Sequence, residues 1–326
     1  MKSKKLLSLA CAATMALTLV ACGGGSSSSN SAASSSGNAG GSGDKIKIGC
    51  TVDELNEFMT YCVEGAEQYC EENGIEIDIV SAEFDVTQQI SQVEDFIAAG
   101  CDGVMVKPCD SDSCQPMVDA CREAGIPIIA FNNPMTADAD AFVGSDHKSS
   151  GYKNAKAICE QLNGEGKVMI LQGAMQQTPA QDRDEGMQEA IAEFPGIELV
   201  DAQDTQWARD EAISITENWI QSGKEFDAII ASSSEPAVGA VIALQDSGYE
   251  MGEVLVGAID AQLADLEMMQ KGWISFGVFQ PAPGQGYHGA ETLHKLIKGE
   301  SVEKYVDVPY EDVTMDNIED FLKLYE

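Results

Sequence analysis

Residues 103–133 read GVMVKPCDSDSCQPMVDACREAGIPIIAFNN, and this stretch contains the pattern that decides the fold. A short apolar run, Gly103–Lys107, is followed by a helical stretch, Ser111–Ala124, and then by a second apolar run, Ile126–Phe131. Gly125 stands directly after the helical stretch, where a residue in the left-handed conformation commonly ends a helix. The stretch therefore predicts two neighbouring parallel strands joined by a helix.

The same alternation of strands and helices continues in both directions from this stretch. Before it, the sequence predicts strands at Ile46–Thr51 and Ile75–Ser81 and helices at Phe58–Asn73 and Gln88–Ala99, and after it a strand at Phe142–Gly144. A second series then predicts strands at Lys167–Gln172, Ile197–Ala202, Ala228–Ala231, Val254–Ile259 and Ile274–Phe279. Two successive series of this kind indicate an α/β fold with two open parallel sheets, each covered by helices on both faces.

Polar side chains gather directly after the predicted strands, at the sheet edge where such folds bind their ligands. They include amides, a guanidinium and a carboxylate, which pair with hydroxyl groups, and aromatic rings, which cover the C–H faces of a sugar. This mixture favours a neutral polyhydroxyl ligand. The candidate ligand-binding residues are Asn56, Phe58, Met59, Asn132, Asn133, Arg183, Trp207, Ser233, Asp260 and Gln280.

The charge of the chain excludes several classes of function. Its 326 residues contain 19 Lys and Arg against 54 Asp and Glu, a formal net charge of -35. Such acidity argues against nucleic-acid binding, which needs clustered positive charge, and against adhesion to anionic lipid headgroups. Hydrophobic residues make up 44% of the chain, which is enough for a large folded core rather than a disordered chain.

Enzymatic and metal-binding functions have little support in the sequence. The histidines, His147, His288 and His294, stand in no arrangement with a nucleophile, and we interpret them as surface or packing residues. No Cys-x-x-Cys occurs, so the spacing typical of a zinc site is absent. We expect no metal site, no cofactor and no catalytic residue. One Gly-x-Gly-x-x-Gly occurs at residues 284–289, but no strand and acidic residue follow at the dinucleotide-binding spacing, so we interpret it as chance.

The first residues of the chain combine positive charge with an apolar run. Several lysines precede an uncharged apolar run, Leu6–Ala21, which is short for a membrane span and typical of an export signal. The quartet LVAC that ends at Cys22 resembles a bacterial lipobox, so we expect removal of residues 1–21 and lipidation of Cys22. An ordinary signal peptide cut at the same place is the alternative. Residues 22–44, rich in Gly and Ser, predict a flexible linker after the lipid anchor.

Beyond the signal and the anchor, eight cysteines remain, at positions 50, 62, 70, 101, 109, 114, 121 and 159. Export permits disulfides, but a core of this size does not need them. Because several of these cysteines stand among apolar residues, we expect free and mostly buried thiols, with one or two disulfides as the alternative.

Several stretches, taken in their order and spacing, resemble a known family. They are Asn56-Glu57-Phe58-Met59, GIPIIAFNN ending at Asn133, VGSD ending at Asp146, LQG at 171–173, DRDEGM around Arg183, GAID ending at Asp260 and FGVFQP around Gln280. From Lys45 to its C-terminus the chain resembles the type I periplasmic binding proteins, and among them the ribose/galactose-type sugar-binding lipoproteins of ABC importers. The resemblance implies two Rossmann-like lobes with parallel sheets, joined by a hinge of three crossings near Gly144–Asp146, Phe279–Pro281 and Val308–Val313.

The resemblance assigns roles to the candidate residues of the first lobe. Asn56 and Phe58 are expected at the edge of the cleft, with Phe58 stacking on the ligand. Met59 stands where a second aromatic residue is usual. Asn132 and Asn133 are expected to bind hydroxyl groups, but they replace the Asp and Arg of the ribose-binding pattern. This difference argues against ribose itself.

In the second lobe the resemblance is more direct. Arg183, Asp260 and Gln280 match the pattern, and Trp207 occupies an aromatic position. Ser233 stands where Asn is typical, which shortens the reach of the side chain and enlarges the pocket. A roomier pocket with fewer charges favours a larger aldose, a deoxy sugar or a polyol over a pentose.

The resemblance also implies a function. It places residues 45–146 plus 281–308 in an N-terminal lobe and residues 147–280 plus 309–326 in a C-terminal lobe. The protein is expected to be a monomeric solute-binding lipoprotein, not an enzyme, that captures a monosaccharide or polyol and delivers it to an ABC permease. Its expected location is the outer face of the cytoplasmic membrane. A sensory binding protein that presents a small ligand to a membrane receptor is the alternative, whereas an extracytoplasmic hydrolase or a repressor core of the same fold is disfavoured.

Overall fold

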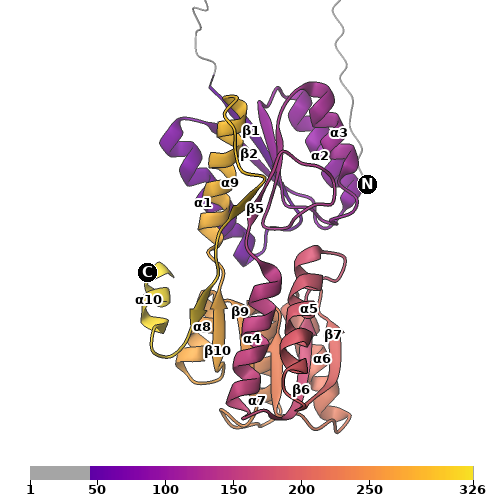
Figure 1. Ribbon diagram of the computed structural model, residues 1–326, viewed down its shortest axis with the longest axis vertical. Coiled ribbons are helices and arrows are strands. Elements are labelled where there is room, and N and C mark those ends of the chain that lie inside the picture. The colour runs from indigo at the N-terminus through magenta and orange to yellow at the C-terminus, as the bar shows by residue number, and fades with distance from the viewer. Residues whose placement is uncertain (1–44, 326) are drawn as a thin grey trace, which may run out of the picture. The chain divides into compact units, whose positions relative to one another are not determined.

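Two six-stranded sheets organise residues 45–325, the part of the chain that the computed structural model describes (Figure 1). In spatial order, the first sheet consists of β11 (Tyr305–Asp307), β5 (Ala141–Gly144), β4 (Ile128–Phe131), β3 (Gly103–Val106), β1 (Lys47–Val52) and β2 (Glu76–Ser81). The second sheet consists of β12 (Glu311–Val313), β10 (Phe276–Phe279), β9 (Leu255–Asp260), β8 (Ala228–Ala231), β6 (Glu165–Gln172) and β7 (Gly196–Asp204). Neighbouring strands are parallel except β10 and β12, which are antiparallel. The predicted α/β fold class is confirmed.

Helices cover both faces of each sheet, and each sheet with its helices is one lobe. In the first lobe, α1 (Glu57–Asn73) and α9 (Ala282–Ile297) pack on one face, and α2 (Val86–Ala98) and α3 (Gln115–Ala124) on the other. In the second lobe, α4 (His147–Gln161) and α5 (Thr178–Ala192) pack on one face, and α6 (Arg209–Gln221), α7 (Ser234–Asp246) and α8 (Leu263–Gln270) on the other. The C-terminal α10 (Ile318–Leu322) packs against α8.

Strand β3 shows why the central strands are apolar along their whole length. Val104 and Val106 pack against α2 and α3, whereas Met105 between them packs beneath α1 and α9. Alternate side chains of a strand point to opposite faces, and both faces of this sheet are covered. All three side chains are therefore completely buried.

The predicted strands all form, with ends displaced by a few residues. Helix α3 begins at Gln115 rather than at position 111, because Asp110 accepts a hydrogen bond from the backbone N–H of Asp112 (3.0 Å) and closes a turn there. Pro116 then occupies the first turn of the helix, where its missing N–H is tolerated. The short strands β11 and β12 are not predicted from the sequence, because three residues are too few to show a period.

The chain passes between the lobes three times, after β5, after β10 and between β11 and β12. These passages lie where the hinge is predicted. The Ser145 hydroxyl of the first passage donates a hydrogen bond to the carbonyl oxygen of Val308 in the third. Adjacent passages of the hinge are thus tied to each other directly.

The predicted export signal, Cys22 and the Gly/Ser linker lie outside the described residues. Across residues 45–325, none of the helices combines the length and the apolar character that a membrane span requires. The eight cysteines of this region are all buried and none of them forms a disulfide, so the expectation of free thiols is confirmed.

In the first lobe, two glycines bring α1 and α9 into close contact. A Cβ on Gly65 of α1 would lie 2.0 Å from the carbonyl oxygen of Pro283, and one on Gly286 of α9 would lie 1.7 Å from the carbonyl oxygen of Cys62. Gly286 belongs to the Gly-x-Gly-x-x-Gly at 284–289, which lies within α9. The role of this glycine is helix packing.

The second lobe uses the same device between α4 and α5. A Cβ on Gly151 of α4 would lie 2.0 Å from the carbonyl oxygen of Arg183, and one on Gly186 of α5 would lie 2.1 Å from that of Lys148. Side chains at either position would force the two helices apart. The close crossing therefore determines where Arg183 stands relative to the rest of the lobe.

We predict that Gly286→Ala destabilises the protein by about 1–3 kcal/mol, because the added methyl group cannot fit against the α1 backbone. The matched control is Gly284→Ala in the same helix, where the nearest atom to a new Cβ is 3.5 Å away. This control is expected to be neutral or slightly stabilising, because Ala favours helix over Gly. Urea unfolding followed by circular dichroism measures both, and equal stabilities of the two variants would contradict the packing role.

Candidate functional site

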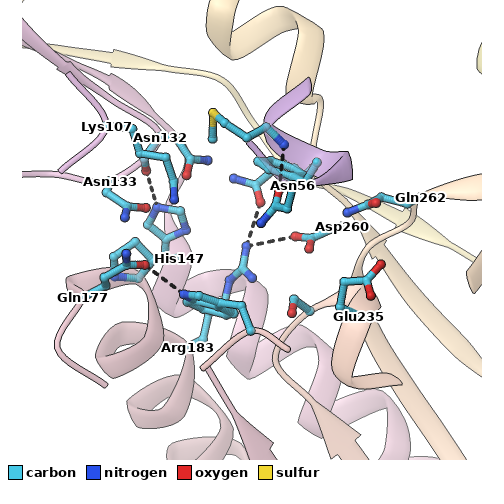
Figure 2. A pocket seen from close by; sticks show the side chains of 16 residues that line it. Asn56, Lys107, Asn132, Asn133, His147, Gln177, Arg183, Glu235, Asp260 and Gln262 are labelled. Carbon is cyan, nitrogen blue, oxygen red and sulfur yellow. Dashed lines mark hydrogen bonds and ion pairs between the residues drawn. The ribbon is translucent and has the colours of Figure 1, made fainter. Parts of the chain in front are cut away.

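All ten candidate residues from the sequence line one pocket between the two lobes (Figure 2). The pocket, including its open side, holds about 520 Å³ of space. Both lobes contribute, mainly through the loops that follow strands, as expected for parallel sheets. Six further residues complete the lining: Lys107, His147, Gln177, Pro179, Glu235 and Gln262.

A helix cap positions the side chains that follow β1. Asn56 is the N-cap of α1, and its side-chain oxygen accepts a hydrogen bond from the backbone N–H of Met59 (3.0 Å). This bond satisfies a donor that the first turn of a helix leaves unpaired. Because the cap fixes the start of α1, it also places Phe58 and Met59, which lie in that turn, against the pocket.

Three pocket residues have backbone angles that residues other than glycine rarely adopt. Asn132 directly follows β4 with φ 60°, Trp207 lies in the loop between β7 and α6 with φ 61°, and Asp260 ends β9 with φ 98°. Strained residues of this kind tend to cluster at functional sites. The Trp207 ring also needs a glycine neighbour, because a Cβ on Gly173 would lie 2.0 Å from it.

Arg183 of α5 is the charged centre of the second-lobe wall, and only 3% of it is exposed. Its Nη2 donates to Oδ1 of Asp260 (3.2 Å) and to Oε1 of Gln280 (2.7 Å). The same nitrogen donates to the hydroxyl of Tyr310 (2.9 Å), and Nη1 donates to the carbonyl oxygen of Ser232. A buried guanidinium needs such partners, and these link the ends of β8, β9 and β10 to the last hinge passage.

The charges around the pocket are balanced. The ion pairs are Lys107 with Asp53, Arg183 with Asp260, and Arg209 with Glu235. Burial raises the pKa of Asp260, and the neighbouring guanidinium of Arg183 opposes that rise. Although the whole chain is strongly acidic, the pocket wall therefore has no excess of either sign to attract a charged ligand.

His147 begins α4 at the first hinge passage and is held neutral. Burial and the positive charge of Arg183 lower the pKa of His147 to about 3. The neutral ring donates from Nε2 to the carbonyl oxygen of Asn132 (2.8 Å) and accepts at Nδ1 from the hydroxyl of Tyr310 (2.8 Å). Both ring nitrogens are thus occupied, Nε2 by the first lobe and Nδ1 by the last hinge passage, and the expectation that His147 is a packing residue holds.

Four buried polar atoms of the pocket have no hydrogen-bond partner among residues 45–325. They are Nε of Arg183, Oγ of Ser233, Oε1 of Gln262 and Nε2 of Gln280. An unpaired buried polar group costs about 1–3 kcal/mol, so proteins normally satisfy these groups. The set offers two N–H donors, one acceptor and one hydroxyl that can do both.

The lining residues that were not predicted from the sequence differ in the signal that the sequence gives for them. Lys107 has a signal, since a lysine ending an apolar strand is unusual, and Gln262 stands two positions after Asp260 at the end of a strand. Gln177 and Glu235 have none, because their sequence neighbourhoods resemble ordinary surface segments.

Comparison with known proteins agrees with this geometry. Residues 50–301 match the model of a family described as periplasmic binding protein domain. The chain belongs to this family.

The relatives of this periplasmic binding protein are similar over most of their length. It is 36% identical to a putative rhizopine-binding protein of Rhizobium meliloti, over 82% of this chain and 89% of that protein. It is 30% identical to a xylitol-binding protein of Mycolicibacterium smegmatis, over 97% of this chain and 87% of that protein. A solved ABC transporter solute binding protein from Bacillus halodurans with bound myo-inositol superimposes with a TM-score of 0.83 at 36% identity, covering 87% of this chain and 99% of that one.

We predict that Arg183→Met destabilises this periplasmic binding protein by about 3–5 kcal/mol, because the substitution leaves the buried carboxylate of Asp260 unpaired. Arg209→Met is the matched control, since the Arg209–Glu235 pair is partly exposed and should contribute about 1 kcal/mol or less. Urea unfolding near pH 7 measures both losses.

The sign of the pH dependence gives a second check on the same variant. Without the guanidinium, the folded-state pKa of Asp260 rises further above that of the unfolded chain, so the folded variant takes up a proton more readily as the pH falls. The stability gap to wild type should therefore shrink between about pH 7 and about pH 5. Equal losses of stability in Arg183→Met and Arg209→Met would contradict the role of Arg183, and so would a stability difference from wild type that does not change with pH.

Proposed function

We propose that this periplasmic binding protein captures a neutral cyclic polyol or monosaccharide between its lobes, outside the cytoplasm, and delivers it unchanged to an ABC permease. The observation that carries the proposal is the set of unpartnered polar atoms on Arg183, Ser233, Gln262 and Gln280. A hydroxyl group both donates and accepts, so one ring bearing several hydroxyls can satisfy all four.

The remaining wall of the pocket supports the same ligand class. Phe58 and Trp207 line it with aromatic rings, which suit the C–H faces of a saturated ring. Amide side chains on Asn56, Asn132 and Asn133 add neutral donors and acceptors on the first-lobe side. The balanced ion pairs favour a ligand without net charge.

Two of the similar proteins favour a polyol within this class. The similar protein from Bacillus halodurans holds myo-inositol, and a similar protein from Mycolicibacterium smegmatis is named for binding xylitol. In this chain, Asn132 and Asn133 stand where the ribose-binding pattern has an acid and a base. The loss of those two charges is consistent with a ligand richer in equivalent hydroxyl groups than ribose.

We infer that the protein does no chemistry on its ligand. General acid–base catalysis requires a titratable side chain that is available to the substrate. His147 is used at both nitrogens, and Asp260, Glu235 and Lys107 are each held in an ion pair. A wall of this kind is suited to binding and release.

The proposed receptor has a hinge and an anchor. Residues 45–146 plus 281–308 form its N-terminal lobe and residues 147–280 plus 309–326 its C-terminal lobe. A ligand that contacts both lobes stabilises the closed state relative to the open one. Lipidation at Cys22 and the linker at residues 22–44 hold this body at the outer face of the cytoplasmic membrane.

A thermal-shift screen of sugars, polyols and nucleosides tests the ligand class. A neutral polyol at 100 times its dissociation constant should stabilise the protein by about 2.7 kcal/mol. Phe58→Ala and Trp207→Ala serve as pocket controls, and each should weaken binding by about 1–3 kcal/mol through lost apolar contact. A shift produced by charged solutes alone would overturn the proposal.

For the anchor, Cys22→Ala should release the protein from membranes without changing the stability of the folded body. The reason is that Cys22 precedes a stretch rich in Gly and Ser, whose composition predicts a flexible linker. Membrane fractionation and urea unfolding measure the two effects. Persistent membrane association of a correctly processed variant would rule out lipid anchoring at this cysteine.

A further inference from the structure

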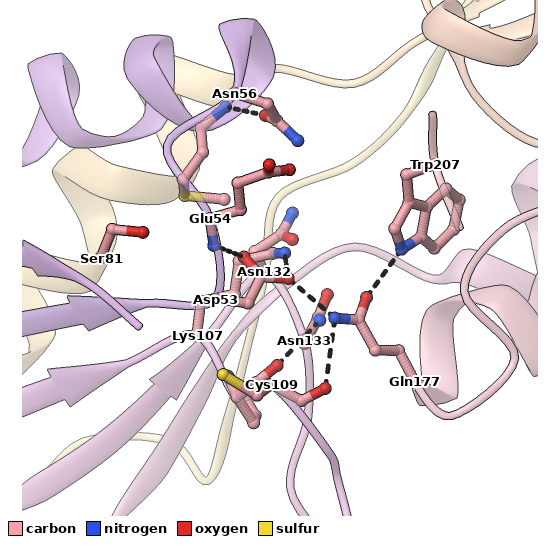
Figure 3. Close-up of polar contacts among 12 residues, drawn as sticks. Asp53, Glu54, Asn56, Ser81, Lys107, Cys109, Asn132, Asn133, Gln177 and Trp207 are labelled. Atoms are coloured by element: carbon pink, nitrogen blue, oxygen red, sulfur yellow. Dashed lines mark hydrogen bonds and ion pairs between the residues drawn. The ribbon is translucent and has the colours of Figure 1, made fainter. Parts of the chain in front are cut away.

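Gln177 lines the pocket where α5 begins, and its side chain extends from the second lobe toward the first. It occupies the N-cap position of α5 but makes no side-chain capping hydrogen bond. It is nevertheless completely buried. Figure 3 shows its amide group lying toward residues of the first lobe on one side and toward Trp207 on the other.

The amide of Gln177 is fully used, and it joins the two lobes. Its Nε2 donates to Oδ2 of Asp53 (2.7 Å) and, more weakly, to the carbonyl oxygen of Cys109 (3.4 Å), both in the first lobe. Its Oε1 accepts a hydrogen bond from the indole Nε1 of Trp207 (2.8 Å) in the second lobe. One side chain thus connects the opposite lobe to an aromatic wall of the pocket.

Asp53 is held in place by its own lobe, independently of Gln177. It follows β1, is 1% exposed, and forms a buried ion pair with Lys107. Its other oxygen accepts a hydrogen bond from the backbone N–H of Glu54 (2.8 Å). The first lobe therefore presents a preformed, buried acceptor to which a neutral donor can attach without bringing a second charge into the interior.

A neighbouring contact supports the same approach of the lobes. The backbone N–H of Thr178, at the first residue of α5, donates to the hydroxyl of Ser111 in the first lobe (3.2 Å). Donors at the start of a helix have no partner within the helix. The beginning of α5 thus faces the first lobe with both a side chain and a backbone group.

We propose that Gln177 is a latch: it holds the lobes together through Asp53 and, in the same closed state, fixes the plane of the Trp207 ring. Because the indole N–H is occupied by Gln177, Trp207 meets a ligand with its ring face alone. Arg183 lies 5.6 Å from the centre of that ring, so the ring is held between the latch and the charged centre of the site. Only the effect of the latch on the ligand rests on the proposed function, because the contact between the lobes does not require a ligand.

Scattering from the ligand-free protein tests the latch without any ligand. Gln177→Ala and the nearly isosteric Gln177→Met should give a larger radius of gyration than wild type, because the buried contact between the lobes is lost. The matched control is Gln176→Ala: this adjacent residue is exposed, and its side chain bonds only within the second lobe, to Gln206. Scattering curves of the position-177 variants that superimpose on those of wild type and control would overturn the proposal.

A rescue experiment separates a latch from a residue that merely supports the fold. Gln177→Glu keeps an acceptor for Trp207 but places a second carboxylate against Asp53, so the lobes should separate. Adding Asp53→Asn to that variant exchanges the roles of the two side chains: the amide at position 53 becomes the donor and the carboxylate at position 177 the acceptor. One negative charge then remains beside Lys107. Compaction should return in the double variant, and a double variant as expanded as the Gln177→Glu single variant would contradict direct pairing.

The binding readout uses myo-inositol as the probe, followed by stopped-flow tryptophan fluorescence. Loss of a hydrogen bond to a buried carboxylate predicts dissociation about 10- to 100-fold faster in Gln177→Ala, with Gln176→Ala unchanged. Unchanged dissociation in Gln177→Ala would overturn the link between latch and ligand. If neither myo-inositol nor any other screened polyol binds, the proposed ligand class fails, while the scattering and rescue measurements still decide the latch.

Discussion

A positive charge buried in a strongly acidic protein sets the arrangement of this molecule. The guanidinium of Arg183 is only 3% exposed, and removing such a group from water is unfavourable by several kcal/mol unless its charge and its donors are partnered. Its partners come from the end of β9, the residue after β10 and the last hinge passage. One side chain therefore constrains two strand ends and the hinge together, and its remaining Nε is left for a group that enters the pocket.

Helix α5 transmits this constraint to the first lobe. It lies so close to α4 that a side chain at Gly151 would collide with the Arg183 backbone, so the position of the guanidinium depends on a helix crossing rather than on a flexible loop. The same helix begins beside Gln177, which reaches Asp53 across the pocket. The ion-pair centre and the contact between lobes are thus parts of one rigid element, and a displacement of α5 would disturb both.

The features that could be predicted from the sequence are those set by short stretches of neighbouring residues. Most of the ten candidate residues line the pocket because they stand near the end of a strand, as Asn132 does after β4, and the carboxyl ends of parallel strands meet at one edge of a sheet. Arg183 lies within α5 instead, and its role was expected from the family resemblance. The role of Gln177 could not be predicted, because it depends on a contact with Asp53, 124 positions earlier in the chain. The neutral state of His147 could not be predicted either, because its low pKa results from burial and from the charge of Arg183, and no sequence pattern reveals these. The strands β11 and β12 form only because the hinge carries three-residue segments to the sheet edges.

The buried thiols make the two lobes chemically distinguishable. Among residues 45–325, seven of the eight cysteines lie in elements or loops of the first lobe, whereas Cys159 on α4 lies in the second. Burial raises their pKa values, to about 12 for Cys109 and Cys121 and about 11 for Cys159, so these eight cysteines present almost no thiolate to an alkylating reagent near neutral pH. Each thiol becomes reactive only when the structure around it opens. Alkylation followed by mass spectrometry would thus record the opening of each lobe separately, using reporters that the native sequence already contains.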